Sequence, residues 1–404
     1  MPDTLICFNT RFIVGGIETY YIRMFEWADK NGYRTVLALP EKCDFDASWS
    51  DTLKRLHVEV FYYKESIKRS RLRNSLKEEI AFAPDEKAVI VTPTVKEYVL
   101  ALYYSNKYAV KANCLLYIYD FIHIRVSRIK LVRMIYRQLL VNRLWDMGLI
   151  FMDEETCEYA RELYREERKG RIIRLGKRFM EFEPEAVESR YKQKEFVILS
   201  VCRMQFPAKG YVLGLMDTFS RLYQDYGNIR LIIIGNGPDY GCLRAKYDLL
   251  DTEVKEHINL LGTVPYDEVD RYMKTANVYV GMGTTLIDAA NNGLIGIVAS
   301  AYQEESYSFG FFHKDYRIVG GFKEETGGRS FQFYELLKEV YNASPEMYFT
   351  MSRETYTVAK ENYGIDEIMS ELTNISICWP KMKIIFLDIV DRILLIPRKI
   401  FRKS

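Results

Sequence analysis

Two positive charges follow an apolar run in the second half of the chain. Arg203 and Lys209 lie in VCRMQFPAKGY, directly after FVILS. Two cations at the end of a strand can neutralise a diphosphate, and they can offset the charge that develops on a departing phosphate. The pair therefore indicates a phosphate site, although a basic loop that faces solvent has the same composition.

Two glycine turns follow later apolar runs. Gly235 and Gly237 lie in IIIGNGPDYG, which is half of a dinucleotide-binding fingerprint. Gly262 and Val264 lie in INLLGTVPYDEV, where a planar base could rest on the backbone. Both turns also fit ordinary tight connections between a strand and a helix.

The stretch GMGTTLIDAANNG, residues 281–293, combines a turn of small residues with one acidic residue. Gly281 and Gly283 allow a ligand to approach the backbone closely, and the amides of Thr284 and Thr285 would open a helix, which favours an anion. Asp288 lies one turn further on, and a carboxylate there accepts hydrogen bonds from sugar hydroxyls. The stretch predicts a site for a phosphate with a sugar beside it; the alternative is a glycine turn with one exposed acid.

The first half offers a second group of candidates. In FIVGGIETYY, Gly15 and Gly16 permit unusual dihedral angles and close approach to a ligand. In YIYDFIHIR, Asp120 or His123 could orient a substrate hydroxyl or accept its proton. Since the chain has only four histidines, the choices for an acid–base group are few, and His123 could equally be structural.

The elements that must position these residues are short strands that alternate with helices. Apolar runs of this length between amphipathic helices predict parallel strands in βαβ units, and two such series predict two doubly wound, Rossmann-like α/β domains. Ligands bind beyond the carboxyl ends of such strands, so we expect the site in a central cleft that the two domains face. The expected strands are 4–8, 35–40, 87–93, 113–121, 148–153, 171–176, 196–203, 230–237, 258–264, 277–282 and 296–300, with the clearest helices over 14–32 and 211–227.

Three regions follow from this division. We expect an N-terminal acceptor-side domain over 1–180, a donor domain over 195–345, and C-terminal helices over 346–404 that cross back and end in a basic amphipathic segment. The polar stretch 177–196 has the character of an interdomain linker.

The composition excludes several classes of protein. The chain has 404 residues, 48% of them hydrophobic and 28% charged, which suits a globular protein of two domains. A net charge of +2 gives no basic excess for binding nucleic acid. The seven scattered cysteines fit reduced thiols in a cytoplasmic protein, and no spacing suggests a metal site. We expect neither a signal peptide nor a spanning helix.

Taken in order, these segments resemble the donor domain of the retaining glycosyltransferases of family 4 (group 1), which have the GT-B fold. The resemblance covers roughly residues 196–300 well and the N-terminal domain more loosely. It implies a nucleotide-diphosphate sugar as donor, retention of anomeric configuration, and no metal or other cofactor. It also implies catalytic roles for Asp120, Arg203 and Lys209, with His123 as a possible acceptor group or base. The implied donor-binding set is Gly15, Gly16, Gly235, Gly237, Gly262, Val264, Gly281, Gly283, Thr284, Thr285 and Asp288.

The chain departs from the family pattern at three places. Asp288 matches the second of two family glutamates, which binds the nucleotide ribose, but the first falls on Val280. Arg203 and Lys209 are one residue further apart than the commonest spacing, and Tyr119 stands where a histidine often precedes Asp120. A subfamily with another contact to the donor sugar and a degenerate, inactive copy both fit these departures.

Basic and amphipathic segments indicate an anionic membrane surface as a partner. Residues 123–143 contain six Lys/Arg and no acid, and 64–77 are similarly basic. Near the C-terminus, Phe386, Ile389 and Ile393 share a helical face opposite two aspartates, which predicts a helix lying at the membrane interface. The alternative is a helix packed on a domain, followed by a solvated basic tail.

The sequence therefore predicts a glycosyltransferase at the cytoplasmic face of the membrane. It would move a sugar from a nucleotide-sugar to a growing, lipid-linked glycan in the assembly of capsule, other surface polysaccharide or lipopolysaccharide. A non-catalytic GT-B protein that binds nucleotide or a partner enzyme is the first alternative, and Val280 is its best support. A nucleotide-sugar epimerase of the same fold is the second.

Overall fold

The computed structural model describes residues 3–63, 86–107, 111–124, 134, 137–320 and 330–376. The chain divides into two compact units. Unit 1 comprises Met1–Gly176 and Ile365–Ser404, and unit 2 comprises Lys177–Gly364. Within the described ranges, no helix combines the length and the apolar character needed to cross a membrane.

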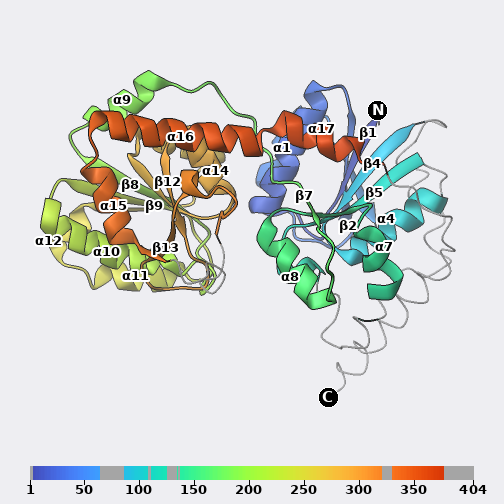
Figure 1. Cartoon of the computed structure of the whole chain (residues 1–404), viewed down its shortest axis with the longest axis horizontal. Helices are drawn as coiled ribbons and strands as arrows, with labels where there is room; N and C mark the ends of the chain where they lie inside the picture. Colours follow the sequence, from blue (N-terminus) through green and yellow to red (C-terminus); the bar gives the residue numbers. More distant parts are fainter. Residues whose placement is uncertain are drawn as a thin grey trace, which may run out of the picture. The chain divides into compact units, whose positions relative to one another are not determined.

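Unit 1 is built on a seven-stranded parallel sheet in the order β3-β2-β1-β4-β5-β6-β7 (Figure 1). Its strands are β1 Thr4–Phe8, β2 Arg34–Pro40, β3 Glu59–Tyr63, β4 Lys87–Thr92, β5 Lys111–Ile118, β6 Leu149–Phe151 and β7 Arg171–Ile172. Its helices are α1 Gly16–Lys30, α2 Ser50–Arg55, α4 Val95–Lys107, α5 Phe121–Ile124, α7 Asn142–Leu144, α8 Glu154–Tyr164 and α17 Ile365–Asn374, with short turns η1 Ala47–Trp49 and η2 Arg137–Val141.

Alternate residues of β1 supply the two apolar layers of unit 1. Leu5 and Cys7 lie in one buried cluster with α1, and Ile6 and Phe8 lie in the other with α4. This alternation follows from the two-residue period of a strand covered by helices on both faces. α17 packs against α1, so a segment that follows unit 2 in the chain completes the core of unit 1.

Unit 2 has a second seven-stranded sheet, in the order β10-β9-β8-β11-β12-β13-β14. Its strands are β8 Phe196–Val201, β9 Ile229–Ile234, β10 Ile258–Gly262, β11 Val278–Gly281, β12 Ile295–Ala299, β13 Tyr307–Phe311 and β14 Phe331–Gln332, and the last two are antiparallel. Its helices are α9 Pro184–Lys192, α10 Tyr211–Tyr226, α11 Tyr240–Asp248, α12 Thr252–Glu256, α13 Tyr266–Thr275, α14 Thr284–Asn291, α15 Phe333–Tyr341 and α16 Pro345–Tyr363, with a short turn η3 Phe312–Lys314.

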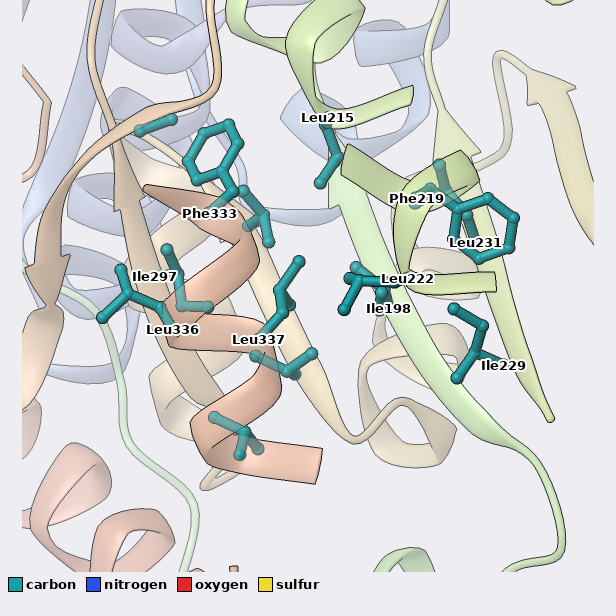
Figure 2. Packing of buried hydrophobic residues seen from close by; sticks show 14 of the residues in the cluster. Ile198, Leu215, Phe219, Leu222, Ile229, Leu231, Ile297, Phe333, Leu336 and Leu337 are labelled. Atoms are coloured by element: carbon teal, nitrogen blue, oxygen red, sulfur yellow. The ribbon is translucent and has the colours of Figure 1, made fainter. Parts of the chain in front are cut away.

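Two helices cover one face of this sheet through large aliphatic and aromatic side chains. Figure 2 shows Leu215, Phe219 and Leu222 of α10 and Phe333, Leu336 and Leu337 of α15 facing strand residues Ile198, Leu231 and Ile297. On the other face, Leu199, Tyr279 and Val298 pack with α14 and α16. Because both faces are covered, most positions of the central strands are apolar.

The stretch 177–196, expected to be an interdomain linker, is folded into unit 2. It contains α9, and the buried Arg190 of that helix donates to the backbone oxygens of Asn292 and Gly293. The chain therefore passes from one unit to the other between Gly176 and Lys177, and again between Gly364 and Ile365. The C-terminal helices are divided in the same way, because α16 belongs to unit 2 and α17 to unit 1.

Three predicted features lie wholly or mostly outside the described residues. They are the basic stretch 64–77, most of 123–143, and the amphipathic segment 381–404.

Candidate functional site

The strand order of unit 2 marks the place where a ligand is expected. The chain runs outward from β8 through β9 to β10, then returns to lay β11 on the other side of β8. Ligands of doubly wound sheets bind at the carboxyl ends of strands where the order reverses in this way. Arg203 and Lys209 follow β8, and the stretch 281–285 follows β11, so the two strongest candidate segments meet at this reversal.

Direct contacts confirm that the connections after β8 and β11 lie together. The Tyr279 hydroxyl donates to the backbone oxygen of Val201 at 3.1 Å and to Thr285 Oγ1 at 2.6 Å. Thr285 Oγ1 itself lies 3.2 Å from the backbone oxygen of Met282. The Thr285 hydroxyl therefore fixes the turn, and the amides of Thr284 and Thr285, at the first turn of α14, have no acceptor within the helix.

The connection after β8 carries the two cations. Arg203 is exposed, whereas Lys209 is partly buried just before α10. The backbone of this loop is supported from the segment after β12: the amide of Tyr302 donates to the Ala208 oxygen, and a Cβ at Gly210 would lie 2.8 Å from the Gln303 oxygen. The loop is thus packed against its neighbours on the sheet edge.

Lys209 and Arg203 have no carboxylate partner among the residues that the structure describes. Burial lowers the pKa of the Lys209 ammonium, and the nearby Cys202 only partly opposes this effect. A partly buried cation without a counter-charge is unfavourable by itself and binds an incoming anion strongly.

The glycines after β9 serve the packing of two loops. A Cβ at Gly235 would clash with the backbone oxygen of Cys202, and one at Gly237 would clash with that of Met204. Gly235 also has a φ of 133° and donates its amide to the Gly262 oxygen at 2.7 Å. These two glycines therefore support the loop that carries Arg203 and Lys209, a role that accounts for them without a ligand.

The remaining glycines differ in the space around them. Gly262 and Gly283 have positive φ angles of 65° and 73°, and nothing lies within 4 Å of a Cβ built on either. A Cβ on Gly281, in contrast, would meet the Tyr279 side chain. Val264 is partly buried against the layer that contains Tyr279. Gly262 and Gly283 thus leave room for a ligand at the backbone, whereas Gly281 is required by its neighbour.

Asp288 is buried and ion-paired. Its Oδ1 lies 2.5 Å from the Nζ of Lys177, and the exposed fractions of the two side chains are 8% and 15%. The alternative of an exposed acid at the start of this helix is therefore wrong.

Val280 is a core residue. It lies within β11, is fully buried, and belongs to the cluster that α10 and α15 cover. Its side chain therefore points away from the open turn after β11 and contributes packing rather than a contact to a sugar.

In unit 1, the turn before α1 is organised around a buried acid. Gly15 is the N-cap of α1, Gly16 its first residue, and a Cβ on Gly15 would lie 2.6 Å from Glu18 Oε2. Burial raises the pKa of Glu18, while hydrogen bonds from the backbone of Ile13 and the side chain of Asn9, together with the charge of Arg11, lower it. Glu18 folds back on the turn, which explains the glycine at position 15.

The connection after β5 carries the other candidates of unit 1. Asp120 is exposed, and its backbone oxygen accepts from the amide of His123 at 3.0 Å. Burial lowers the pKa of His123, with Asp120 opposing and Arg11 reinforcing the shift; within the described residues, its Nδ1 has no hydrogen-bond partner. Tyr119 is buried against Tyr20, Tyr21 and Tyr117, so it does not take the place of a histidine as a polar contact.

A comparison with family models identifies the second unit. Residues 181–307 match the model of "Glycosyl transferases group 1". Unit 2 carries a group 1 glycosyltransferase domain. The match contains every candidate of unit 2, from Arg203 to Asp288.

A curated relative supports this domain assignment. Alpha-monoglucosyldiacylglycerol synthase from Acholeplasma laidlawii is 32% identical over 140 residues, which are 32% of this chain and 34% of that protein. The aligned part thus spans about a third of the relative's length.

Solved structures extend the likeness to both units. A glycosyltransferase from Rickettsia africae has a TM-score of 0.62 at 12% identity, covering 93% of this chain and 100% of that one. Sucrose-phosphate synthase from Thermosynechococcus elongatus has a TM-score of 0.60 at 13% identity, covering 92% and 97%. Trehalose-6-phosphate synthase, OtsA, gives 0.57 at 10% identity, covering 93% and 100%. The chain has the GT-B fold of glycosyltransferases.

Two residues that contact candidate positions, one in each unit, were not among the sequence candidates. Glu18 stands in the same GGIE segment as Gly15, so a buried acid three residues after a glycine was a usable local indication. Lys177 lies in a highly charged stretch, and nothing in its neighbourhood distinguishes it. No group of three His, Cys, Asp or Glu side chains within the described ranges is arranged to hold a metal ion.

Proposed function

We propose that this chain transfers a sugar from a nucleotide-diphosphate sugar to a glycan or lipid-linked acceptor, with retention of configuration. The proposal depends on two cations, Arg203 and Lys209, which have no carboxylate partner in the described part of the chain. Both lie at the strand-order reversal of a group 1 glycosyltransferase domain. Two cations without a carboxylate partner favour the binding of an anionic ligand.

The donor diphosphate would lie between these cations and the first amides of α14. As the bond to the sugar breaks, negative charge grows on the leaving phosphate, and charges fixed beforehand stabilise that state more than the ground state. Lys209 would contribute most, because a partly desolvated ammonium interacts more strongly than one in water. In the same scheme Gly262 and Val264 support the base, and Asp288 accepts from the ribose.

On the acceptor side, Asp120 and His123 are the proposed groups. The His123 ring is neutral over a wider pH range than an exposed histidine, since burial lowers its pKa, and its Nδ1, which has no partner within the described residues, suits an acceptor hydroxyl. In this proposal Gly15 and Gly16 also contribute to binding of the nucleotide-sugar donor.

The curated relative favours a particular acceptor class. Its name describes the synthesis of a glucosylated diacylglycerol. We therefore propose a lipid acceptor at the cytoplasmic face of an anionic membrane, and glycolipid synthesis as a second candidate beside the assembly of capsule, other surface polysaccharide or lipopolysaccharide.

Thermal stabilisation by nucleotides and nucleotide sugars tests the donor site, since a ligand of the folded state raises the melting temperature. We expect a shift with one nucleotide family, and its loss in Arg203→Ala and Lys209→Ala. The sugar nucleotide so chosen is then incubated with diacylglycerol vesicles, and the anomeric configuration of any product is read by NMR.

The outcomes distinguish a transferase from a protein that only binds nucleotide, and both of these from a protein without a donor site. Binding without transfer to any lipid or glycan acceptor would favour a non-catalytic protein, for which Val280 is the best sequence argument. The absence of any nucleotide shift would refute the donor site altogether.

A further inference from the structure

The ion pair between Lys177 and Asp288 joins two segments that are far apart in sequence. Lys177 is the first residue of unit 2, and Asp288 lies in the second turn of α14. Both side chains are largely shielded from solvent, with exposed fractions of 15% and 8%. Charges this deeply buried are costly, so their retention calls for a reason.

The backbone around Lys177 holds the ammonium in place. Its amide donates to the Tyr363 oxygen at 2.7 Å, and Lys177 forms an isolated parallel bridge with Gly364. Three residues on, the Met180 amide donates to Asn291 Oδ1 at 2.9 Å, and the Met180 oxygen accepts from the Tyr356 hydroxyl at 2.6 Å. The segment therefore lies fixed between α14 and α16.

This arrangement determines how Asp288 can act. One carboxylate oxygen is engaged by a cation whose own position is fixed, so the orientation of the carboxylate is fixed as well. Hydrogen-bond acceptors that are held in place before binding discriminate between ligands more strongly than mobile ones, because binding does not have to restrict the rotation of their side chains.

We propose that Lys177 is a positioning residue that makes the site selective for a ribose over a deoxyribose nucleotide, by holding Asp288 in the orientation that accepts the ribose hydroxyls. The inference rests on the proposed function, since it assigns a further residue to the same donor site. It also differs from a purely structural role, which would change stability and all ligands alike.

Calorimetric titration of the full chain tests this, with UDP, GDP, ADP and CDP and the 2′-deoxy form of each. We expect the wild-type protein to bind the preferred ribonucleotide about ten- to a hundredfold more tightly than its deoxy form, as for a hydrogen bond to a charged group. In Lys177→Met this ratio should fall below about threefold, mainly through weaker binding of the ribonucleotide, whereas Lys177→Arg should keep it.

A matched control removes a comparable pair from the same unit. Arg230 lies 2.5 Å from Glu195, and it is near the start of β9 rather than at the carboxyl edge. Arg230→Met should leave the ribose preference unchanged. If Lys177→Met does not fold, Lys177→Gln keeps a neutral donor at the position and should give an intermediate ratio.

The outcomes for Lys177→Met and for the wild-type protein test the role of Lys177 and the proposed donor site separately. A Lys177→Met protein that keeps the ribose preference, or loses affinity for both forms equally, overturns the inference and leaves the donor site standing. A wild-type protein that binds none of the eight nucleotides overturns the proposed function, and the inference with it.

Discussion

Replacing Lys209 with methionine should stabilise the free protein and weaken its binding of nucleotide. The ammonium is partly buried beside Cys202, no carboxylate of the described residues pairs with it, and burial lowers its pKa. Methionine keeps the length of the side chain and removes the charge. The free protein then loses an uncompensated charge, whereas the complex loses a contact to phosphate.

The two effects act on different states of the protein. Because burial lowers the pKa of the Lys209 ammonium, removing its charge should raise the stability of the folded protein at neutral pH. For a unit of this size, 1 kcal/mol raises the melting temperature by about 2–4 °C. The lost charge-assisted hydrogen bond should weaken nucleotide binding by about 1.5–3 kcal/mol, or roughly ten- to over a hundredfold.

The sign of the pH dependence gives a further check. Because the folded pKa is lowered, the charge of Lys209 costs stability fully at neutral pH, and the cost disappears as the pH rises through the folded value toward that of an ordinary lysine. The advantage of Lys209→Met should therefore shrink in alkaline buffer.

Scanning calorimetry with and without the preferred nucleotide measures both effects. Lys246→Met is the matched control, because Lys246 pairs with Asp217 at 2.6 Å in the same unit and lies on α11. The control should gain no stability and should bind nucleotide as the wild type does. A Lys209→Met protein that melts lower than the wild type, or binds nucleotide equally well, would refute the reasoning.

Two further predictions concern buried positions of unit 2. Val280→Glu, which restores the family residue, should cost about 3–5 kcal/mol in urea unfolding, since it buries an unpaired carboxylate; a stable variant with higher transferase activity would contradict the strand assignment. His313 is buried between Phe311 and Thr355, and burial with the charge of Lys314 lowers its pKa to about 4, against the opposing charge of Glu354. Folding keeps this ring neutral, so stability should fall by up to about 3 kcal/mol as the pH drops from 6.5 to 4, and His313→Gln should remove that part of the slope.

The sequence predicted most of the parallel strands of both sheets, but it missed β3, an edge strand in which three of five residues are exposed. The run 4–8 is β1, and the helix expected over 211–227 is α10. Strands buried on both faces are continuous apolar runs and are easily found. The antiparallel strands were not predicted: β13 contains Gly310 at a φ of 101°, and β14 has two exposed residues. Their pairing depends on contacts that local composition does not encode.

The candidate site was predictable where chemistry is local. Arg203, Lys209 and the turn at Gly283 each follow a strand, and the strand order then brings them together. Lys177 could not be predicted in this way, because its partner is Asp288 and the pairing depends on the bridge to Gly364.

Valine at position 280 is compatible with the proposed donor site, because its side chain belongs to the core of unit 2. The side chain at this position packs in the core, so a glutamate there would bury a carboxylate rather than reach the cations that follow β8. Here the only acid of the 281–293 stretch, Asp288, is already balanced by Lys177, whereas Lys209 and Arg203 have no carboxylate partner in the described part of the chain. Neither cation is therefore paired within the described residues, as the proposed anionic donor requires. Within the proposed function, valine at this position is thus compatible with donor binding through Arg203 and Lys209.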